Sequence, residues 1–97
     1  MTANHLNLRN TLLEIGAEGN LSIFSDGKSI VLSTREVEQV VTWLSQEQKE
    51  KRFIVDTTRL ELDTHGSLRV WKGSTSLFIS ASETSRALNW LKQHRVS

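Results

Sequence analysis

Aromatic and basic side chains are interleaved in one short part of the chain, between residues 59 and 78. One further aromatic residue stands in a matching position nearer the N-terminus. Rings interleaved with arginine and lysine can stack on unpaired bases while the cations meet phosphates. The candidate binding residues are Arg59, Arg69, Trp71, Lys72, Phe78 and Phe24.

Nothing in the sequence indicates covalent or metal chemistry. The chain has no cysteine, which removes thiolate nucleophiles, disulfides and cysteine-based metal sites. The histidines are scattered, with no carboxylate at a metal-ligand spacing. Glu14 and Glu61 occupy matching positions, and we interpret them as cross-strand partners of Arg59 or Arg69 rather than as an acid–base pair. We therefore expect a protein that is not an enzyme and has no metal or other cofactor.

The composition is typical of one small soluble domain. The chain has 97 residues, 37% of them hydrophobic and 24% charged, with a net charge of +1. No apolar run exceeds three residues, so no segment is long enough to cross a bilayer. General nucleic-acid binders are often more basic, so the charge neither requires nor excludes such a partner. We expect a cytoplasmic protein.

The chain matches itself without a gap when it is shifted by 47 residues, so that Trp43 lies over Trp90 and Gly19 over Gly66. Self-similarity at a fixed period means that one supersecondary unit is used twice. The copies span about residues 6–50 and 53–97, and only a short segment separates them. We expect a single domain, residues 1–97, made of both copies.

Each copy ends in a predicted helix. Ser33 with Glu36, and Ser80 with Glu83, fit the capping box, in which the serine hydroxyl and the glutamate satisfy backbone N–H groups at the helix start. Apolar residues follow at helical spacing, so one stripe of each helix faces a core.

The ends of the helices are less sharply marked. We expect the first helix to fray between residues 46 and 51, a polar run, and the second near His94. Trp43 and Trp90 lie off the central stripes, and we expect them to pack at the margin of the core or between the helices.

Short alternating segments precede each helix. Residues 21–23 and 30–32 place aliphatic side chains on one face, as do 68–70 and 77–79 in the second copy. Phe53 and Val55 differ in parity from Leu60 and Leu62, so the chain turns or bulges around residues 57–58. A turn gives a β-β-β-β-α copy and a bulge gives β-β-β-α; we favour four strands.

These elements predict an α+β fold of two pseudo-symmetric β-β-β-(β)-α repeats, with both helices covering one combined antiparallel sheet. Alternation then defines the residues on the open face of the sheet. In the second copy they are Arg59, Glu61, Arg69, Trp71, Ser76 and Phe78, and in the first they are Leu12, Glu14, Ser22, Phe24, Ser29 and Val31.

This open face has three interpretations. Its aromatics and arginines fit a stacking platform for unpaired bases. An exposed apolar patch also marks subunit interfaces, which predicts a homodimer. Thirdly, the sheet could curl and bury the rings. Nucleic-acid binding and subunit contact can coexist.

The order of segments in each copy resembles a PUR repeat. Residues 66–70, 76–80 and Glu83 follow the pattern of a glycine turn, a basic and aliphatic strand, a strand ending in an L-x-L-S-like sequence, and a helix. Residues 19–23 and 30–33 repeat this order. The resemblance to the PUR-alpha and Whirly group implies paired ββββα units that bind single-stranded DNA or RNA. The chain has Asn20 and Ser67 where PUR repeats carry lysine or arginine.

Together these patterns favour a non-enzymatic protein that binds single-stranded DNA or RNA on the open sheet face. The alternative is a small dimeric interaction or regulatory module that binds no nucleic acid. The copies differ at two positions, where Arg69 and Lys72 replace Ser22 and Ser25. We therefore expect any binding site to lie in the second copy.

Overall fold

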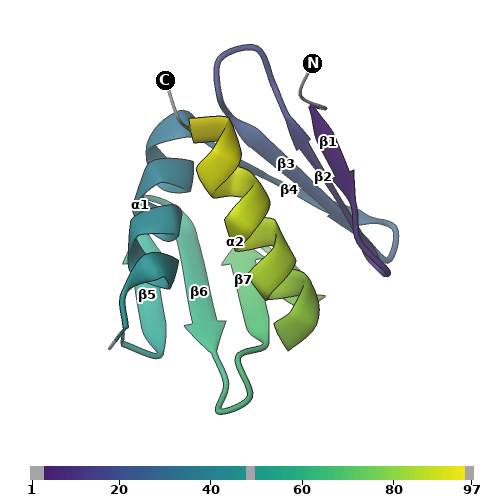
Figure 1. The fold of residues 1–97 in the computed structure, drawn as a ribbon. Coiled ribbons are helices and arrows are strands. Elements are labelled where there is room, and N and C mark those ends of the chain that lie inside the picture. The colour runs from purple at the N-terminus through teal and green to yellow at the C-terminus, as the bar shows by residue number, and fades with distance from the viewer. Residues whose placement is uncertain (1–3, 48–49, 96–97) are drawn as a thin grey trace.

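The computed structural model of the chain describes residues 4–47 and 50–95. Each copy contains four strands followed by one helix, so the four-strand alternative is correct (Figure 1). The first copy contains β1 (His5–Asn7), β2 (Thr11–Ile15), β3 (Leu21–Ser25), β4 (Lys28–Leu32) and α1 (Thr34–Ser45). The second contains β5 (Arg52–Val55), β6 (Thr58–Leu62), β7 (Leu68–Lys72), β8 (Thr75–Ile79) and α2 (Ala81–Arg95).

The strands form two antiparallel sheets, one per copy, each with its four strands in sequence order. The α+β class is as predicted, but the expected single combined sheet is replaced by two. Tight turns make each strand pair with its sequence neighbour, which leaves β4 and β8 as edges. These two edges lie against each other without belonging to one sheet.

Two-residue turns fix the register of the hairpins that carry the aromatic residues. Asp26 and Gly27 have φ values of 53° and 74°, as a type I′ turn requires at both central positions. Gly73, with φ 62°, begins the corresponding turn of the second copy. As a result Phe24 pairs with Ser29, and Trp71 with Ser76.

Both predicted capping boxes are present. The backbone N–H of Glu36 donates to Ser33 Oγ at 3.2 Å, and that of Glu83 donates to Ser80 Oγ at 3.4 Å. The first helix ends at Ser45, and residues 48–49 of the predicted fraying segment lie outside the described residues. In the described part of the chain, neither helix is long and apolar enough to span a membrane.

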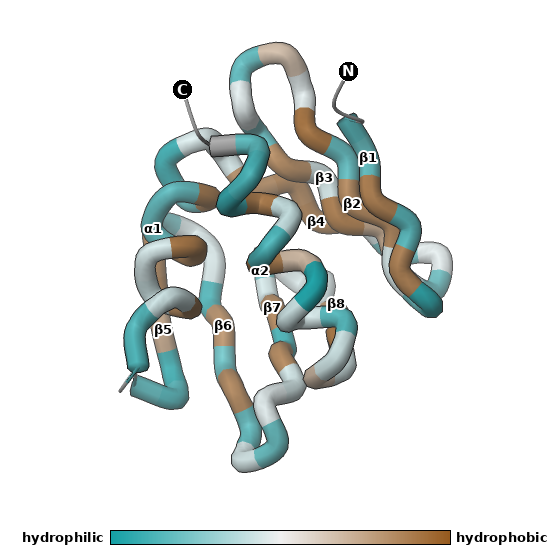
Figure 2. Tube along the Cα trace, viewed as in Figure 1, coloured by the Kyte–Doolittle hydropathy of each residue, from teal (hydrophilic) through white to brown (hydrophobic). Residues whose placement is uncertain are grey.

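Both sheets and both helices contribute to one hydrophobic core. Hydrophobic positions recur along the strands and on the helices that face them (Figure 2). Side chains from both sheets and both helices line the same small internal cavity, among them Leu13, Val40, Leu60 and Leu91.

Each helix begins against the sheet of the other copy. Glu36 of α1 accepts a hydrogen bond from Thr58 Oγ1 of β6, and Glu83 of α2 accepts one from the backbone N–H of Asn10. Further along α1, the ring of Trp43 stacks on Phe53 of β5 at 5.2 Å between centroids. The helices therefore tie the two copies together.

The tryptophans are part of this packing. Trp43 is 3% exposed and its Nε1–H donates to the carbonyl of Glu50 at 2.9 Å. Trp90 is also buried and meets His94 edge-on, with 4.5 Å between ring centroids. As predicted, they pack in and beside the core.

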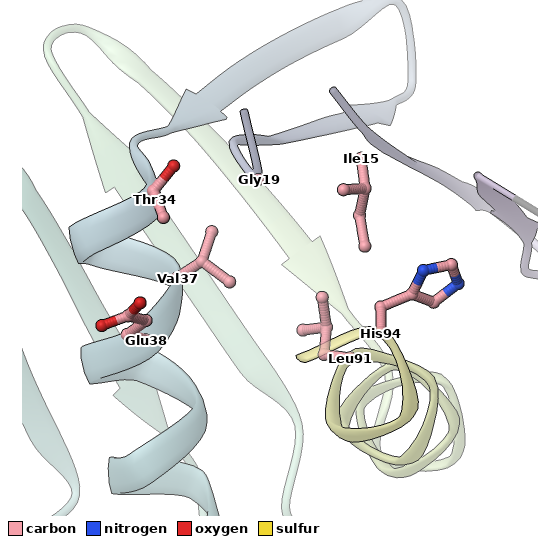
Figure 3. A pocket seen from close by; sticks show the side chains of 7 residues that line it. All are labelled: Ile15, Gly19, Thr34, Val37, Glu38, Leu91 and His94. Carbon is pink, nitrogen blue, oxygen red and sulfur yellow. The ribbon is translucent and has the colours of Figure 1, made fainter. Parts of the chain in front are cut away.

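The core opens to solvent where the start of α1 faces the end of α2. A pocket of about 200 Å³ lies here, between Val37, Leu91 and Ile15 (Figure 3). His94 and Glu38 lie at its rim. Val37 and Leu91 belong to the core and Ile15 packs against it, so we assign the pocket to helix packing.

Candidate nucleic-acid interface

The outer face of the β5–β8 sheet carries charged and aromatic side chains in two cross-strand rows. The first row is Ile54, Arg59, Trp71 and Ser76, and the second is Arg52, Glu61, Arg69 and Phe78. Side chains directly opposite each other on antiparallel strands lie about 4.5–5.5 Å apart at Cβ. The sheet thus brings together four of the six predicted site residues. We call Arg59, Trp71, Arg69 and Phe78 the arginine–aromatic cluster.

The two arginines of the cluster lie over the two rings. Arg59 Cζ is 4.3 Å from the centroid of the Trp71 ring. Arg69 Cζ is 6.0 Å from the Trp71 ring and 5.4 Å from the Phe78 ring. Exposed cation–π contacts contribute about 0.5–1 kcal/mol each. These contacts hold the guanidinium groups at the surface, where their charge can attract an anion.

Neither cluster arginine forms an ion pair with a carboxylate of the described residues. The sequence interpretation paired Glu61 with Arg59 or Arg69, but its carboxylate lies 3.1 Å from Arg52 Nε instead. Arg52 reaches it because β5 places the two residues directly opposite each other. The positive charges of Arg59 and Arg69 are therefore not neutralised by a neighbouring carboxylate in the described part of the chain.

The two rings are not equally open. Phe78 lies on the edge strand β8 and is 49% exposed, whereas Trp71 on the inner strand β7 is partly buried under Arg59. A planar ligand therefore meets Phe78 first and reaches the face of Trp71 by displacing a guanidinium group.

The corresponding face of the β1–β4 sheet differs in chemistry. Phe24 is 38% exposed there, opposite Ser29, and belongs to a different sheet from the cluster. Its neighbours across the strands are Leu12 and Ser29, where Trp71 has Arg59 and Ser76. Phe24 thus lacks the guanidinium groups that surround the rings of the second copy.

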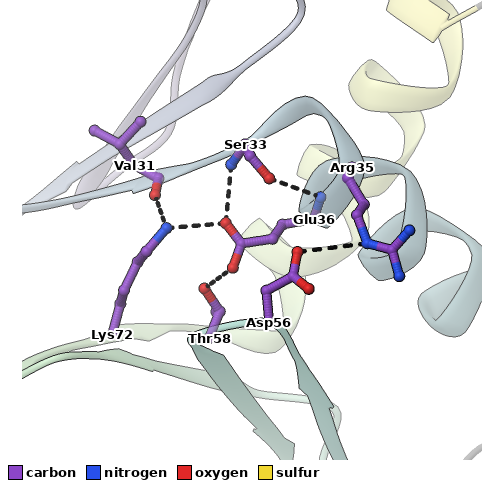
Figure 4. A network of polar contacts seen from close by, with 7 residues as sticks. All are labelled: Val31, Ser33, Arg35, Glu36, Asp56, Thr58 and Lys72. Atoms are coloured by element: carbon purple, nitrogen blue, oxygen red, sulfur yellow. Dashed lines mark hydrogen bonds and ion pairs between the residues drawn. The ribbon is translucent and has the colours of Figure 1, made fainter.

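Lys72 has a different contact from the one predicted. Its ammonium group donates to Glu36 Oε1 at 2.9 Å and to the carbonyl of Val31 at 2.6 Å (Figure 4). Lys72 shares the parity of Leu68 and Val70, so it points to the helix side of the sheet. This parity could have been read from the sequence. Lys72 joins the two copies and is not part of the cluster.

The carboxylate that binds Lys72 is almost completely buried. Glu36 is 2% exposed, and burial by itself acts to raise its pKa. Hydrogen bonds from Thr58, Ser33 and Lys72 outweigh burial and bring the pKa of Glu36 below its ordinary value. Glu36 therefore stays ionised and serves to hold the copies together.

Glu83 is its counterpart in the second copy. Burial acts to raise the pKa of Glu83, but hydrogen bonds from Asn10 and Ser80 lower it below its ordinary value. Both carboxylates are thus anionic at neutral pH, and each accepts hydrogen bonds from a copy other than its own.

Two residues of the interface were missing from the sequence prediction. Arg52 and Ile54 lie on the outer face of β5, and Ile54 is 64% exposed. Their parity is opposite to that of Phe53 and Val55, which was a usable signal. The prediction omitted them because the existence of β5 was still an open alternative.

In the part of the chain that the structure describes, no group of three or more histidine, aspartate or glutamate side chains could hold a metal ion. Comparison with protein-family models, curated proteins and solved structures gives no match. The resemblance to PUR repeats is therefore still a prediction, and the interface has to be argued from its own geometry.

Proposed function

We propose that the outer face of the β5–β8 sheet binds single-stranded DNA or RNA without catalysing a reaction. The observation that carries this proposal is the arginine–aromatic cluster, in which each ring lies within 4.3–6.0 Å of a guanidinium carbon. The PUR-like order of segments agrees with it. The contribution of one base stacked on an aromatic side chain is about 1–3 kcal/mol.

Binding to the cluster can proceed in two steps. A first base stacks on the open ring of Phe78, and Arg69 meets the adjacent phosphate. A second base displaces Arg59 from the Trp71 ring, and the freed guanidinium group pairs with the next phosphate. This exchange is favourable because base stacking, about 1–3 kcal/mol, exceeds an exposed cation–π contact of about 0.5–1 kcal/mol.

The same chemistry predicts weak sequence preference. Ring faces and guanidinium groups contact features that all nucleotides share, whereas base edges need donors and acceptors in fixed positions. We therefore expect binding of many sequences, with an affinity that falls as salt rises because bound counterions are released.

The proposal is tested by titrating labelled single-stranded DNA and RNA at two salt concentrations. We expect binding that weakens with salt and that falls at least tenfold in the double variant Trp71→Ala with Arg69→Ala. Trp71 is the most open of the three tryptophans, so quenching of its fluorescence reports the same event. Absence of binding at low salt contradicts the proposal.

A subunit contact on the same face is the second candidate. The exposure of Ile54 favours it, because an open aliphatic side chain beside an aromatic cluster is typical of an interface. Sedimentation velocity of the same double variant separates the two functions. A dimer that dissociates in the variant, together with no nucleic-acid binding, favours the subunit contact.

A further inference from the structure

The two copies meet at two junctions that occupy corresponding places in the repeat. At each one, the tip of a hairpin in one copy lies beside the edge strand and the helix start of the other copy. The difference that matters most here is Lys72 at the tip of the β7–β8 hairpin, where the β3–β4 hairpin has Ser25.

An ammonium group fills the first junction. Lys72 Nζ lies 2.9 Å from the Glu36 carboxylate and 2.6 Å from the edge-strand carbonyl of Val31 (Figure 4). A primary ammonium has three N–H donors and no acceptor, so a buried carboxylate and an edge carbonyl suit it well.

The second junction keeps the acceptors but has no lysine in the corresponding position. Glu83, 4% exposed, takes the place of Glu36, and Phe78 takes the place of Val31 on the edge strand. The short side chain of Ser25 donates to the carbonyl of Asn10 at 3.1 Å instead of crossing the junction. An open pocket of about 280 Å³ lies here, lined by Ser25, Phe78 and Glu83 among others.

An unpartnered hydroxyl is a second sign that this junction is incomplete. Thr11 Oγ1 is buried without a hydrogen-bond partner among the described residues, and Thr11 is 4% exposed. The counterpart of Thr11 is Thr58, whose hydroxyl donates to Glu36 at 2.5 Å. In the first junction Thr58 and Lys72 both donate to Glu36, whereas in the second the backbone N–H of Asn10 donates to Glu83 and neither Thr11 nor a lysine of the described residues does so.

We infer that the pocket at Ser25, Phe78 and Glu83 is a binding site for a primary alkylammonium group, supplied by a polyamine or by a lysine side chain of a partner. The ammonium would donate to the Glu83 carboxylate and to the carbonyl of Phe78, as Lys72 does to Glu36 and Val31. The pocket is several times the 30 Å³ or so that one water occupies, which leaves room for the attached alkyl chain. Arg69 and Phe78 line both this pocket and the arginine–aromatic cluster, but the inference does not rest on the proposed nucleic-acid binding.

Charged side chains of both signs surround the pocket. Lys28 and Arg69 line the pocket together with Asp26, and the charge of Arg9 acts on Glu83. Lys28 stands directly opposite Ser25 in the hairpin, and its side-chain ammonium forms no hydrogen bond or ion pair with the described residues. It is the one nearby lysine on this hairpin that could compete with an external ammonium.

The test uses n-butylammonium, which copies the lysine side chain, with tetramethylammonium as the matched control. Tetramethylammonium has the same charge but no N–H donor. At about ten times the dissociation constant, we expect n-butylammonium to raise the melting temperature by roughly 5–10 °C. We expect no such rise in Glu83→Gln, nor in Ser25→Lys, where the introduced lysine fills the site.

Amide resonances keep the test decisive if a variant fails to fold. The backbone N–H groups of Asn10 and Ser80 donate to Glu83, so their resonances in the unmodified protein should move with n-butylammonium and not with tetramethylammonium. Equal movement with both salts, or none with either, overturns the inference. Stabilisation seen only in Lys28→Ala also overturns it, because Lys28 would then fill the site itself.

Putrescine distinguishes the two sources. Its second ammonium can reach the carboxylate of Asp26 at the pocket, so tighter binding than n-butylammonium supports a polyamine ligand. Equal binding of the two amines supports a lysine side chain of a partner.

Discussion

The two copies share a framework and differ on two surfaces. Both have capped helices, four short strands and a glycine turn, yet only the second has arginines beside its exposed rings. The junctions between the copies also differ. Lys72 fills the first, whereas the shorter Ser25 leaves an open pocket at the second. The shared positions build the fold, and the positions that differ create places where a ligand can bind.

The largest expected effect comes from breaking the completed junction. In Lys72→Ala the Glu36 carboxylate stays buried with its ammonium partner removed, which should cost about 2–4 kcal/mol of unfolding free energy. The matched change Ser25→Ala should cost less than about 1 kcal/mol. Urea denaturation of both variants measures the difference, and equal losses would show that the junctions are equivalent.

The threonine pair sharpens the same comparison. Thr58 donates to a buried carboxylate, so Thr58→Val should cost about 1.5–3 kcal/mol. The hydroxyl of Thr11 has no partner in the described residues, so Thr11→Val should be neutral or stabilising. Thermal and urea unfolding test this pair. A larger loss in Thr11→Val than in Thr58→Val would contradict the assignment of contacts.

The aromatic pair compares the two sheet faces. Phe78→Ala should weaken binding of single-stranded DNA or RNA by about 5- to 100-fold, since one stacked base contributes about 1–3 kcal/mol. Phe24→Ala, on the other sheet, should change it less than about twofold, because its ring has no arginine beside it. Titrations at low salt measure both. Equal loss in the two variants would mean that the faces act alike.

Acid should weaken both junctions. The pKa values of Glu36 and Glu83 are lowered in the folded protein, so their contribution is complete above the ordinary glutamate pKa of about 4.3 and is lost as the pH falls below it. Urea midpoints should therefore decline below about pH 4.3. Glu36→Gln should flatten this decline, and an unchanged slope in that variant would count against the role of Glu36.

Local structure was predictable from the sequence because it depends on short-range chemistry. Capping boxes and alternating strands are set by residues within a few positions of each other, and Ser33 with Glu36 shows this directly. The separation into two sheets was not predictable. Alternation of side chains shows which face of a strand is buried, but it does not show whether the edge strands of the two copies pair with each other. The packing of Trp43 at the core was predicted, but its stacking partner Phe53, which belongs to the other copy, was not.

The candidate site was predictable in part. Cross-strand register follows from turn lengths, so Trp71, Arg59 and Phe78 could be placed on one face in advance. The contact of Lys72 with Glu36 could not, since it joins residues from different copies. The parity of Lys72 indicated the correct side of the sheet, and only the structure supplies the partner.

The central claim is that single-stranded nucleic acid binds the face of the second copy. It is tested most directly by mapping amide and indole resonances while a short single-stranded oligonucleotide is added. We expect movement of Arg69, Phe78 and the Trp71 indole, with little at the counterparts Ser22, Val31 and Phe24. Equal movement on both sheets, or none at low salt, would contradict the account.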